Sequence, residues 1–193
     1  METQTEKRII ETSGRLLAEN GPGAFSLDVL AKQPEMQGFE IFTLVGKEDQ
    51  IYEQLFFQLT KELKEIVDGI YSGQNSPAEE FEMLFKQLHR LFKQKPYYLT
   101  IVFDKDIPRQ YSGADKIISG IKDTAKKYLS GLITRGKAQK VFTTDAETEI
   151  LVKEIIGSFQ TLMNDMHLAD KMVRDLQKYR SVTGTFKLTL DRT

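Results

Sequence analysis

The sequence predicts an all-α protein of about nine helices, with an N-terminal three-helix helix-turn-helix unit and a larger C-terminal helical domain. Apolar residues recur at the 3.6-residue helical spacing along most of the 193 residues. Serine, proline and glutamate stand at helix-start positions before several of these segments. The two-residue alternation typical of a strand is confined to the C-terminal tail.

The first two predicted helices are short and well delimited. An apolar face made by Ile9, Ile10, Leu16 and Leu17, with Ser13 among them, defines the first helix, which Asn20-Gly21 ends. Ser26 is a predicted N-cap for a second helix through Ala31, and Pro34 falls in the turn that follows.

A long apolar stripe that begins after Lys47 predicts a helix of about six turns. Gly73-Gln74-Asn75 ends it, and Ser76-Pro77-Ala78-Glu79 then combines an N-cap serine, a first-turn proline and a glutamate at the third helical position. The stripe consists of Ile51, Tyr52, Leu55, Phe56, Leu59, Leu63, Ile66, Val67 and Ile70.

The middle of the chain continues with helices. Pro96 opens a short apolar segment over 97–103, which a breaker-rich stretch at 108–113 follows. A longer helix is predicted over 115–135.

The C-terminal third begins with Thr144-Asp145-Ala146-Glu147, which predicts a second capping box and a helix behind it. A last helix is predicted over 168–180. The tail over 183–193 alternates like a strand, but the sequence predicts no other strand. We therefore expect a frayed tail or one that pairs with a partner.

Composition favours a cytoplasmic protein. The chain has no cysteine, which excludes disulfides, thiolate metal sites and cysteine nucleophiles. No apolar run reaches the roughly 18 residues of a membrane span, and the polar N-terminus does not resemble a signal peptide.

Charge is distributed unevenly behind a net value of −1. Residues 1–83 carry 7 Lys and Arg against 16 Asp and Glu, whereas residues 84–140 carry 13 against 4. The N-terminal part is therefore acidic and the middle is basic, the reverse of what a strong N-terminal DNA-binding unit needs.

Several residues of the N-terminal segment stand at positions that together form a pattern. Gly21 ends the first helix, Ser26 begins the second, and Leu30-Ala31 lies within it. Ile41-Phe42 follows farther on, and Gly46-Lys47-Glu48-Asp49 precedes the long apolar stripe. This pattern resembles the TetR family of bacterial transcriptional regulators, in which an Ile-Ala pair, a Leu-Tyr pair and a Ser-Lys-Glu opening of the fourth helix take these three positions. The resemblance covers residues 5–56. It implies a DNA-binding domain over 1–46 and an effector-binding and dimerisation domain over 47–193.

The DNA-contacting residues that the resemblance implies depart from the family pattern. Pro34-Glu35 replaces the Ala-Gly of the turn, and Phe42 lacks the tyrosine hydroxyl that would donate to a phosphate. Residues 1–47 hold 5 basic and 7 acidic side chains. The candidate DNA-binding residues are Ser26, Gln37, Gly38, Phe42, Thr43 and Lys47. Lys7, Arg8, Arg15 and Lys32 are further candidates to neutralise phosphates.

Large, soft side chains in the second half suit either a hydrophobic effector pocket or a core without a ligand. The candidate pocket residues are Phe85, His89, Tyr97, Tyr98, Phe103, Tyr128, Phe159 and Met163. Two histidines without paired carboxylates argue against a metal site. The last helices would suit a four-helix interface in a homodimer.

The basic stretch over 86–140 leaves two interpretations open. It is either a solvated face or a surface that attracts an anionic partner such as an acyl thioester, a phospholipid headgroup or an acidic protein.

We expect a homodimeric regulator that binds double-stranded DNA under control of a hydrophobic or anionic small-molecule effector. The alternative is a protein of the same fold that has lost DNA binding and binds lipid or a protein partner. No glycine-rich phosphate loop and no nucleophile–base pair occurs in the sequence, so we expect neither an enzyme nor a cofactor.

Overall fold

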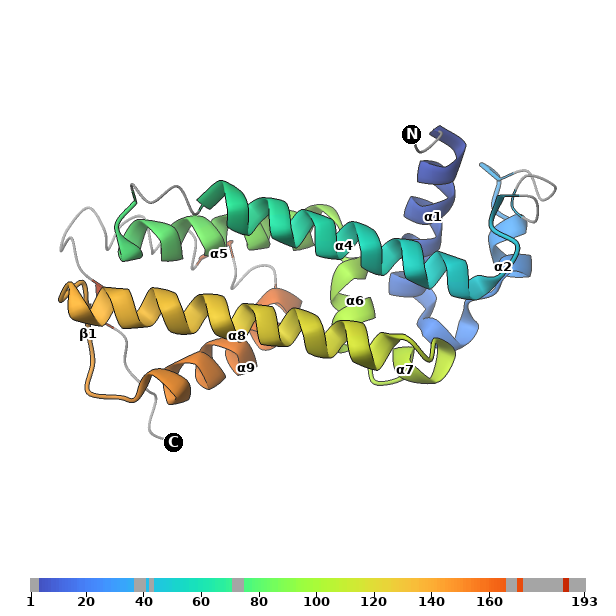
Figure 1. The fold of residues 1–193 in the computed structure, drawn as a ribbon. Helices are drawn as coiled ribbons and strands as arrows, with labels where there is room; N and C mark the ends of the chain where they lie inside the picture. The colour runs from blue at the N-terminus through green and yellow to red at the C-terminus, as the bar shows by residue number, and fades with distance from the viewer. Residues whose placement is uncertain are drawn as a thin grey trace. The chain divides into compact units, whose positions relative to one another are not determined.

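A computed structural model describes residues 4–36, 41, 44–70, 75–165, 170–171 and 186–187. Within these residues the chain forms eight α-helices, one 3-10 helix and two short strands (Figure 1). The elements are α1 Gln4–Asn20, η1 Pro22–Ala24, α2 Leu27–Ala31, α4 Glu48–Ile70, α5 Pro77–Gln94, α6 Tyr97–Phe103, α7 Ile107–Gln110, α8 Ala114–Ala138, β1 Phe142–Thr143, α9 Thr148–Asn164 and β2 Phe186–Lys187. The predicted all-α class is confirmed.

The helices belong to two compact units. The first unit combines residues 1–62 with residues 94–119, and the second combines 63–93 with 120–193. The chain passes between the units inside α4, at the end of α5 and inside α8. The predicted division at residue 46 follows the resemblance and stays a prediction.

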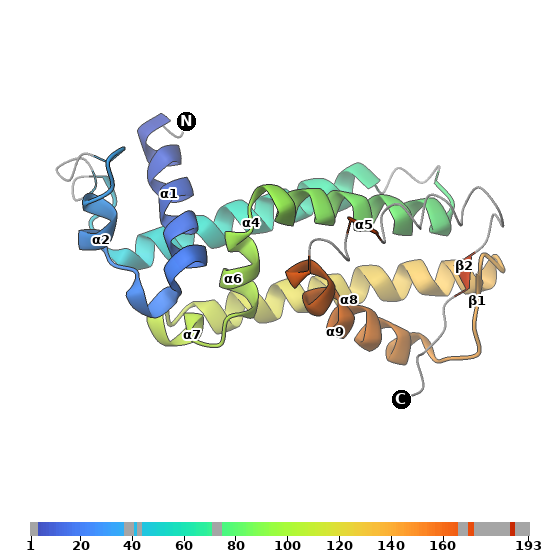
Figure 2. The same ribbon diagram turned by 180° about the vertical axis from the view of Figure 1, so that it is seen from behind.

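The first unit is built around close contact between α1 and α6, which lie side by side in Figures 1 and 2. Gly14 makes this contact possible, because a β-carbon added there would lie 2.6 Å from Cγ of Tyr97. The ring of Tyr97 therefore packs on the backbone of α1 at a position where only hydrogen fits.

An aromatic cluster joins the remaining parts of the first unit. Tyr52 of α4 stacks on Tyr111, which follows α7, with ring centroids 5.9 Å apart. Phe25 meets Tyr52 edge-on at 6.0 Å, and Phe56 lies 6.2 Å from Tyr111. The loop before α2, the first half of α4 and the segment after α7 thus share one core.

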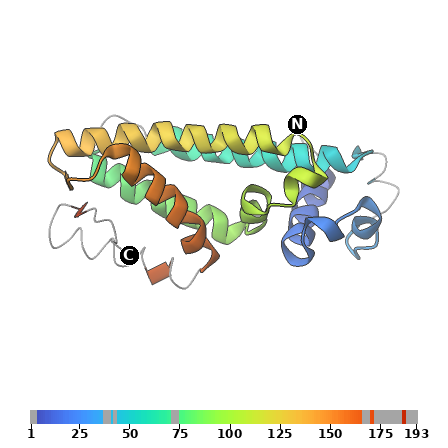
Figure 3. The ribbon, with the colours of Figure 1, turned by 90° about the horizontal axis from the view of Figure 1, so that it is seen from below.

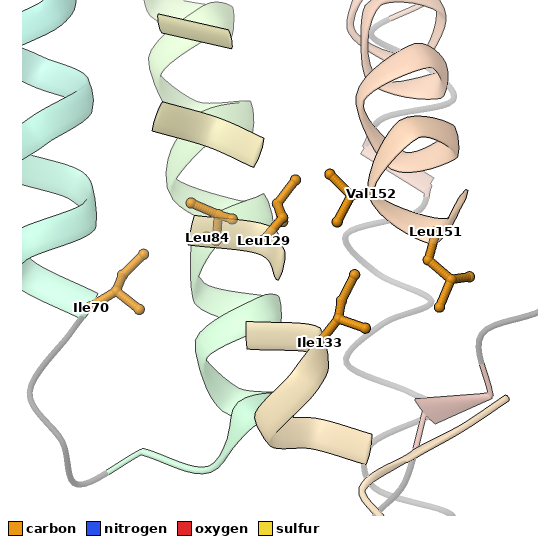
Figure 4. Close-up of a cluster of buried hydrophobic side chains, with 6 residues drawn as sticks. All are labelled: Ile70, Leu84, Leu129, Ile133, Leu151 and Val152. Carbon is orange, nitrogen blue, oxygen red and sulfur yellow. The ribbon is translucent and has the colours of Figure 1, made fainter. Parts of the chain in front are cut away.

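The second unit has an aliphatic core to which four helices contribute (Figure 4). Its buried members are Ile70 of α4, Leu84 of α5, Leu129 and Ile133 of α8, and Leu151 and Val152 of α9. Figure 3 shows α9 running obliquely to α8. The apolar periodicity of the sequence therefore corresponds to real burial in this unit.

Two helix-start predictions have different outcomes. The capping box at Ser76 is confirmed, since Glu79 N donates to Ser76 Oγ at 3.3 Å and Ser76 N donates to Glu79 Oε2 at 2.9 Å. The box at Thr144 is wrong. Thr144 Oγ1 accepts from Ala146 N at 3.2 Å in a local turn, and α9 begins later, at Thr148, without a side-chain cap.

The tail prediction also needs correction, because an intramolecular strand partner exists. Phe186–Lys187 pairs in parallel with Phe142–Thr143, with Phe142 opposite Phe186 (Figure 2). The partner segment consists of two residues in the connection between α8 and α9, too short for its alternation to be recognised in the sequence. The helix predicted over 168–180 lies outside the described residues apart from 170–171, which are helical.

Gly14→Ala should destabilise the protein by about 1–3 kcal/mol. The added methyl group would overlap Cγ and the two Cδ atoms of the buried Tyr97 ring, which lie close to the backbone and cannot easily move away. Gly69→Ala on α4 is the matched control. No atom lies within 4 Å of its added β-carbon, and the change should stabilise the helix by about 0.5–1 kcal/mol. Urea unfolding followed by circular dichroism measures both, and equal effects would contradict the packing described here.

Candidate functional site

Helix α2 begins as the sequence predicts. Ser26 has an extended backbone, and its Oγ accepts a hydrogen bond from Val29 N at 3.2 Å. The first helical amide, Leu27 N, donates to Glu48 Oε1 of α4 at 3.2 Å. The hydroxyl predicted to contact DNA therefore caps its own helix, and a carboxylate holds the start of α2 to the start of α4.

Lys47 stands at the entrance to α4 with its side chain exposed to solvent. Gly46 before it has φ 66°, the left-handed region that glycine adopts at little cost. The Lys47 amide donates to Val45 O at 2.7 Å. The turn is thus held by its backbone, and the ammonium group remains available to a phosphate.

Two other basic side chains of the N-terminal segment form ion pairs with carboxylates. Lys7 lies 3.8 Å from Glu11 within α1. Arg15 lies 3.8 Å from Glu19 on the same helix and also hydrogen bonds to Glu35, in the turn after α2. Part of the positive charge of the N-terminal segment is therefore cancelled by neighbouring acids of the protein.

Four predicted DNA-binding residues, Gln37, Gly38, Phe42 and Thr43, lie outside the described residues. Three neighbours of these residues are buried: Met36 before them, Ile41 among them and Val45 after them. Leu44 faces solvent with 43% of its surface exposed.

The predicted pocket residues divide between the two units. Tyr97, Tyr98 and Phe103 lie on α6 in the first unit. The second unit contains Phe85 and His89 on α5, Tyr128 on α8, and Phe159 and Met163 on α9. Neither compact unit therefore contains the whole predicted set.

A polar network in the first unit surrounds Glu62, which sequence reasoning missed. Glu62 Oε1 accepts from Tyr98 Oη at 2.8 Å and from Lys95 Nζ at 2.6 Å. The Lys95 ammonium also lies 5.5 Å from the centroid of the Tyr98 ring. No sequence signal marked Glu62, because its partners are more than 30 residues away and the residue lies among other acids of α4.

The two tyrosines of this network differ in hydrogen bonding. Burial, reinforced by the Glu62 carboxylate, raises the pKa of Tyr98. Burial, with the charges of Glu11 and Glu62 adding to it, raises the pKa of Tyr97 to about 12. The Tyr97 hydroxyl has no hydrogen-bond partner among the described residues. Both phenols therefore stay neutral donors at physiological pH.

The second unit contains a buried carboxylate paired with a partly exposed arginine, and a tyrosine hydroxyl without a hydrogen bond among the described residues. Arg135 Nη2 lies 2.5 Å from Glu80 Oε2, and Glu80 is only 3% exposed. Burial, with Glu80 reinforcing it, raises the pKa of Tyr128 to about 12, and its hydroxyl has no partner among the described residues. Sequence reasoning missed Glu80 and Arg135, which are 55 residues apart.

His89 lies elsewhere in the second unit, on the face of α5 next to Asp170. Its Nε2 is 3.0 Å from Asp170 Oδ1 but lacks hydrogen-bond geometry. Lys93 Nζ donates to the same carboxylate at 3.0 and 3.1 Å. Among the described residues of this unit, the His89 imidazole nitrogen and the Tyr128 hydroxyl are thus the buried side-chain polar atoms without a hydrogen bond.

The part of the chain that the structure describes contains neither a metal-ligand cluster nor a membrane-spanning helix. No three His, Asp or Glu side chains gather there in a way that would hold a metal ion. Across the same residues, every helix is too short or too polar to cross a membrane.

Among the described residues, the N-terminal end of this all-helical protein consists of α1, a serine-capped α2, the buried Ile41 and the start of the long α4. Compared by sequence, the chain matches no protein-family model and no curated protein.

Solved structures match almost the whole chain. The ketosteroid transcriptional regulator KstR2 of Mycobacterium tuberculosis has a TM-score of 0.77 at 12% identity, covering 93% of this chain and 95% of that one. The TetR family regulator PfmR from Thermus thermophilus has a TM-score of 0.75 at 16% identity, covering 99% and 100%. AibR, solved with isovaleryl coenzyme A and operator DNA, has a TM-score of 0.67 at 14% identity, covering 86% and 95%.

The chain therefore has the fold of the TetR family of transcriptional regulators. The expected resemblance is confirmed at the level of fold, over the C-terminal part as well as the N-terminal segment that suggested it.

Tyr98→Phe should destabilise the protein by about 1.5–3 kcal/mol, because it removes a hydrogen bond to a carboxylate. Tyr128→Phe is the matched control. It removes a hydroxyl that has no hydrogen-bond partner among the described residues, so stability should stay unchanged or rise by up to about 1 kcal/mol. Urea unfolding of both variants tests this assignment, which a larger loss in Tyr128→Phe would overturn.

Proposed function

We propose that this protein is a transcriptional regulator that binds DNA through its N-terminal helices and responds to a small apolar effector. The observation that carries the proposal is the near-complete match to regulators of this fold, one of which was solved with both an acyl coenzyme A and operator DNA. The exposed Lys47 at the entrance to α4 supports it locally.

The DNA-binding part would be residues 1–46, with Gln37 to Thr43 presented to the major groove and Lys47 to a phosphate. A homodimer, formed by residues 47–193, would place two such segments on successive turns of one duplex. Phosphate binding by few lysines and arginines implies a moderate affinity with a shallow dependence on salt.

The effector would bind mainly through apolar contacts. In the second unit, Glu80 engages Arg135, and Glu82, which is 4% exposed, engages Lys86. These cations are already balanced, so a buried carboxylate of an effector would gain little from them. The Tyr128 hydroxyl and the His89 imidazole instead suit a carbonyl or hydroxyl group. An anionic part of the effector, such as that of an acyl thioester, would interact with exposed lysines of the basic stretch.

Control of DNA binding would follow from linkage. An effector that binds one spacing of the two DNA-binding segments better than another shifts the population toward that spacing. The effector and DNA then weaken each other's binding by the same factor.

A second candidate function is lipid or partner binding by a protein that no longer binds DNA. The specific observation in its favour is charge, because the 5 basic side chains of residues 1–47 are outnumbered by 7 acidic ones and two of them are held by carboxylates.

Binding to a pool of random duplex DNA, measured by fluorescence polarisation at low salt, distinguishes the two functions. The regulator should bind, with an affinity that falls as salt rises, and Lys47→Ala should weaken binding and lower the salt slope by about 0.9. Lys64→Ala on α4, also an exposed lysine, is the matched control and should leave both unchanged.

Mass spectrometry of lipids extracted from the purified protein completes the test. Copurified lipid together with no DNA binding at low salt would reject the regulator and favour the second function.

A further inference from the structure

An ion pair between Arg15 and Glu35 connects α1 to the turn after α2. Arg15 lies on the exposed side of α1, and Glu35 lies in the turn after α2, 20 residues later. Met36 and then Gln37 follow Glu35 directly, so Glu35 comes just before the segment proposed to enter the major groove.

Arg15 faces two carboxylates rather than one. Besides Glu35, Glu19 lies 3.8 Å from the guanidinium. One positive charge is thus opposed by two negative charges. A guanidinium paired in this way attracts a phosphate less strongly than a free one, because the phosphate must compete with the carboxylate that already accepts from Nη2.

The pair is open to solvent, with 46% of the Arg15 side chain and 41% of the Glu35 side chain exposed. Exposed ion pairs contribute little to folding. Solvent exposure also means that an approaching duplex can reach the guanidinium without rearrangement of the core.

The turn does not need the Glu35 carboxylate for its shape. Met36 N donates to Gln33 O at 3.0 Å, Gln33 N donates to Leu30 O at 3.1 Å, and Met36 is buried. Gln33 Nε2 also donates to Val29 O at 3.2 Å. The backbone and the neighbours of Glu35 hold the turn, so the carboxylate can be neutralised without altering it.

We propose that Glu35 limits DNA affinity by holding Arg15 away from the phosphate backbone. This inference rests on the proposed function and names a residue that sets the DNA affinity. Glu35 is a positioning residue, because its effect passes through Arg15 rather than through contact with DNA. Neutralising it converts Arg15 into an additional phosphate contact.

The test is a double-mutant cycle on the full-length protein, with a pool of random duplex DNA as the probe. Glu35→Gln should tighten binding at about 50 mM salt by roughly threefold to tenfold and steepen the salt slope by about 0.9, the value of one phosphate contact. Arg15→Gln alone should change affinity less than twofold. Arg15→Gln combined with Glu35→Gln should remove the gain.

Asp145→Asn is the matched control, since Asp145 is an exposed acid in the connection between β1 and α9 of the second unit. It changes the net charge by the same amount and should leave affinity unchanged. Thermal melting by circular dichroism confirms that each variant is folded, and Glu35→Ala provides a second neutral variant.

The outcomes separate the inference from the function on which it rests. Binding by the unmodified protein that Glu35→Gln does not tighten overturns the inference alone. A gain that persists without Arg15, or that Asp145→Asn reproduces, also overturns it, because the effect is then one of net charge. If neither the unmodified protein nor Glu35→Gln binds duplex DNA at low salt, the proposed DNA-binding function fails as well.

Discussion

The packing of Tyr97 on Gly14 is the constraint on which the first unit depends. It brings α6 against α1, although Tyr97 and Gly14 are 83 positions apart in the sequence, and Glu62 bonds to Tyr98 of the same helix and to Lys95 just before it. The helices that carry the candidate DNA-binding residues thus share a core with a segment from the middle of the chain. A close backbone approach and a charge-assisted network act on consecutive residues of α6, so a shift of α6 would disturb both.

Carboxylates of the first unit bond to backbone and basic groups near its N-terminus. The Glu48 carboxylate holds the start of α2, Glu35 and Glu19 hold Arg15, and Glu11 holds Lys7. Glu48 therefore contributes to local structure, whereas the acids that face Lys7 and Arg15 reduce the positive charge of this segment. In the second unit, Glu80 is buried and paired with Arg135, whereas the Tyr128 hydroxyl has no hydrogen-bond partner among the described residues. The first feature bears on the DNA affinity of the proposed regulator, and the second on the chemistry of its proposed effector.

Much of the fold follows from local sequence rules, whereas the functional groupings do not. The Ser26 cap, the Ser76 capping box and the stripe on α4 were predictable because the residues that make them are neighbours along the chain. The capping box predicted at Thr144 was wrong because the Thr144 hydroxyl accepts a hydrogen bond from Ala146 N, which is nearer in the sequence than the amide of a capping box. The pairing of β2 with β1, the Glu62 network and the Glu80–Arg135 pair join residues distant in sequence. Periodicity carries no information about such contacts. Tyr97 and Phe159, grouped in the sequence prediction by chemistry alone, belong to different units.

Native-state hydrogen exchange in increasing urea tests most directly whether α6 and α1 form one cooperative element. Because Tyr97 packs on Gly14 and Tyr98 is bonded to Glu62, the buried amides of α1 and of α6 should converge on a single opening free energy as urea rises. Amides of α1 that open at a lower free energy while those of α6 stay protected would contradict this account. They would show instead that the N-terminal helices form an element of their own.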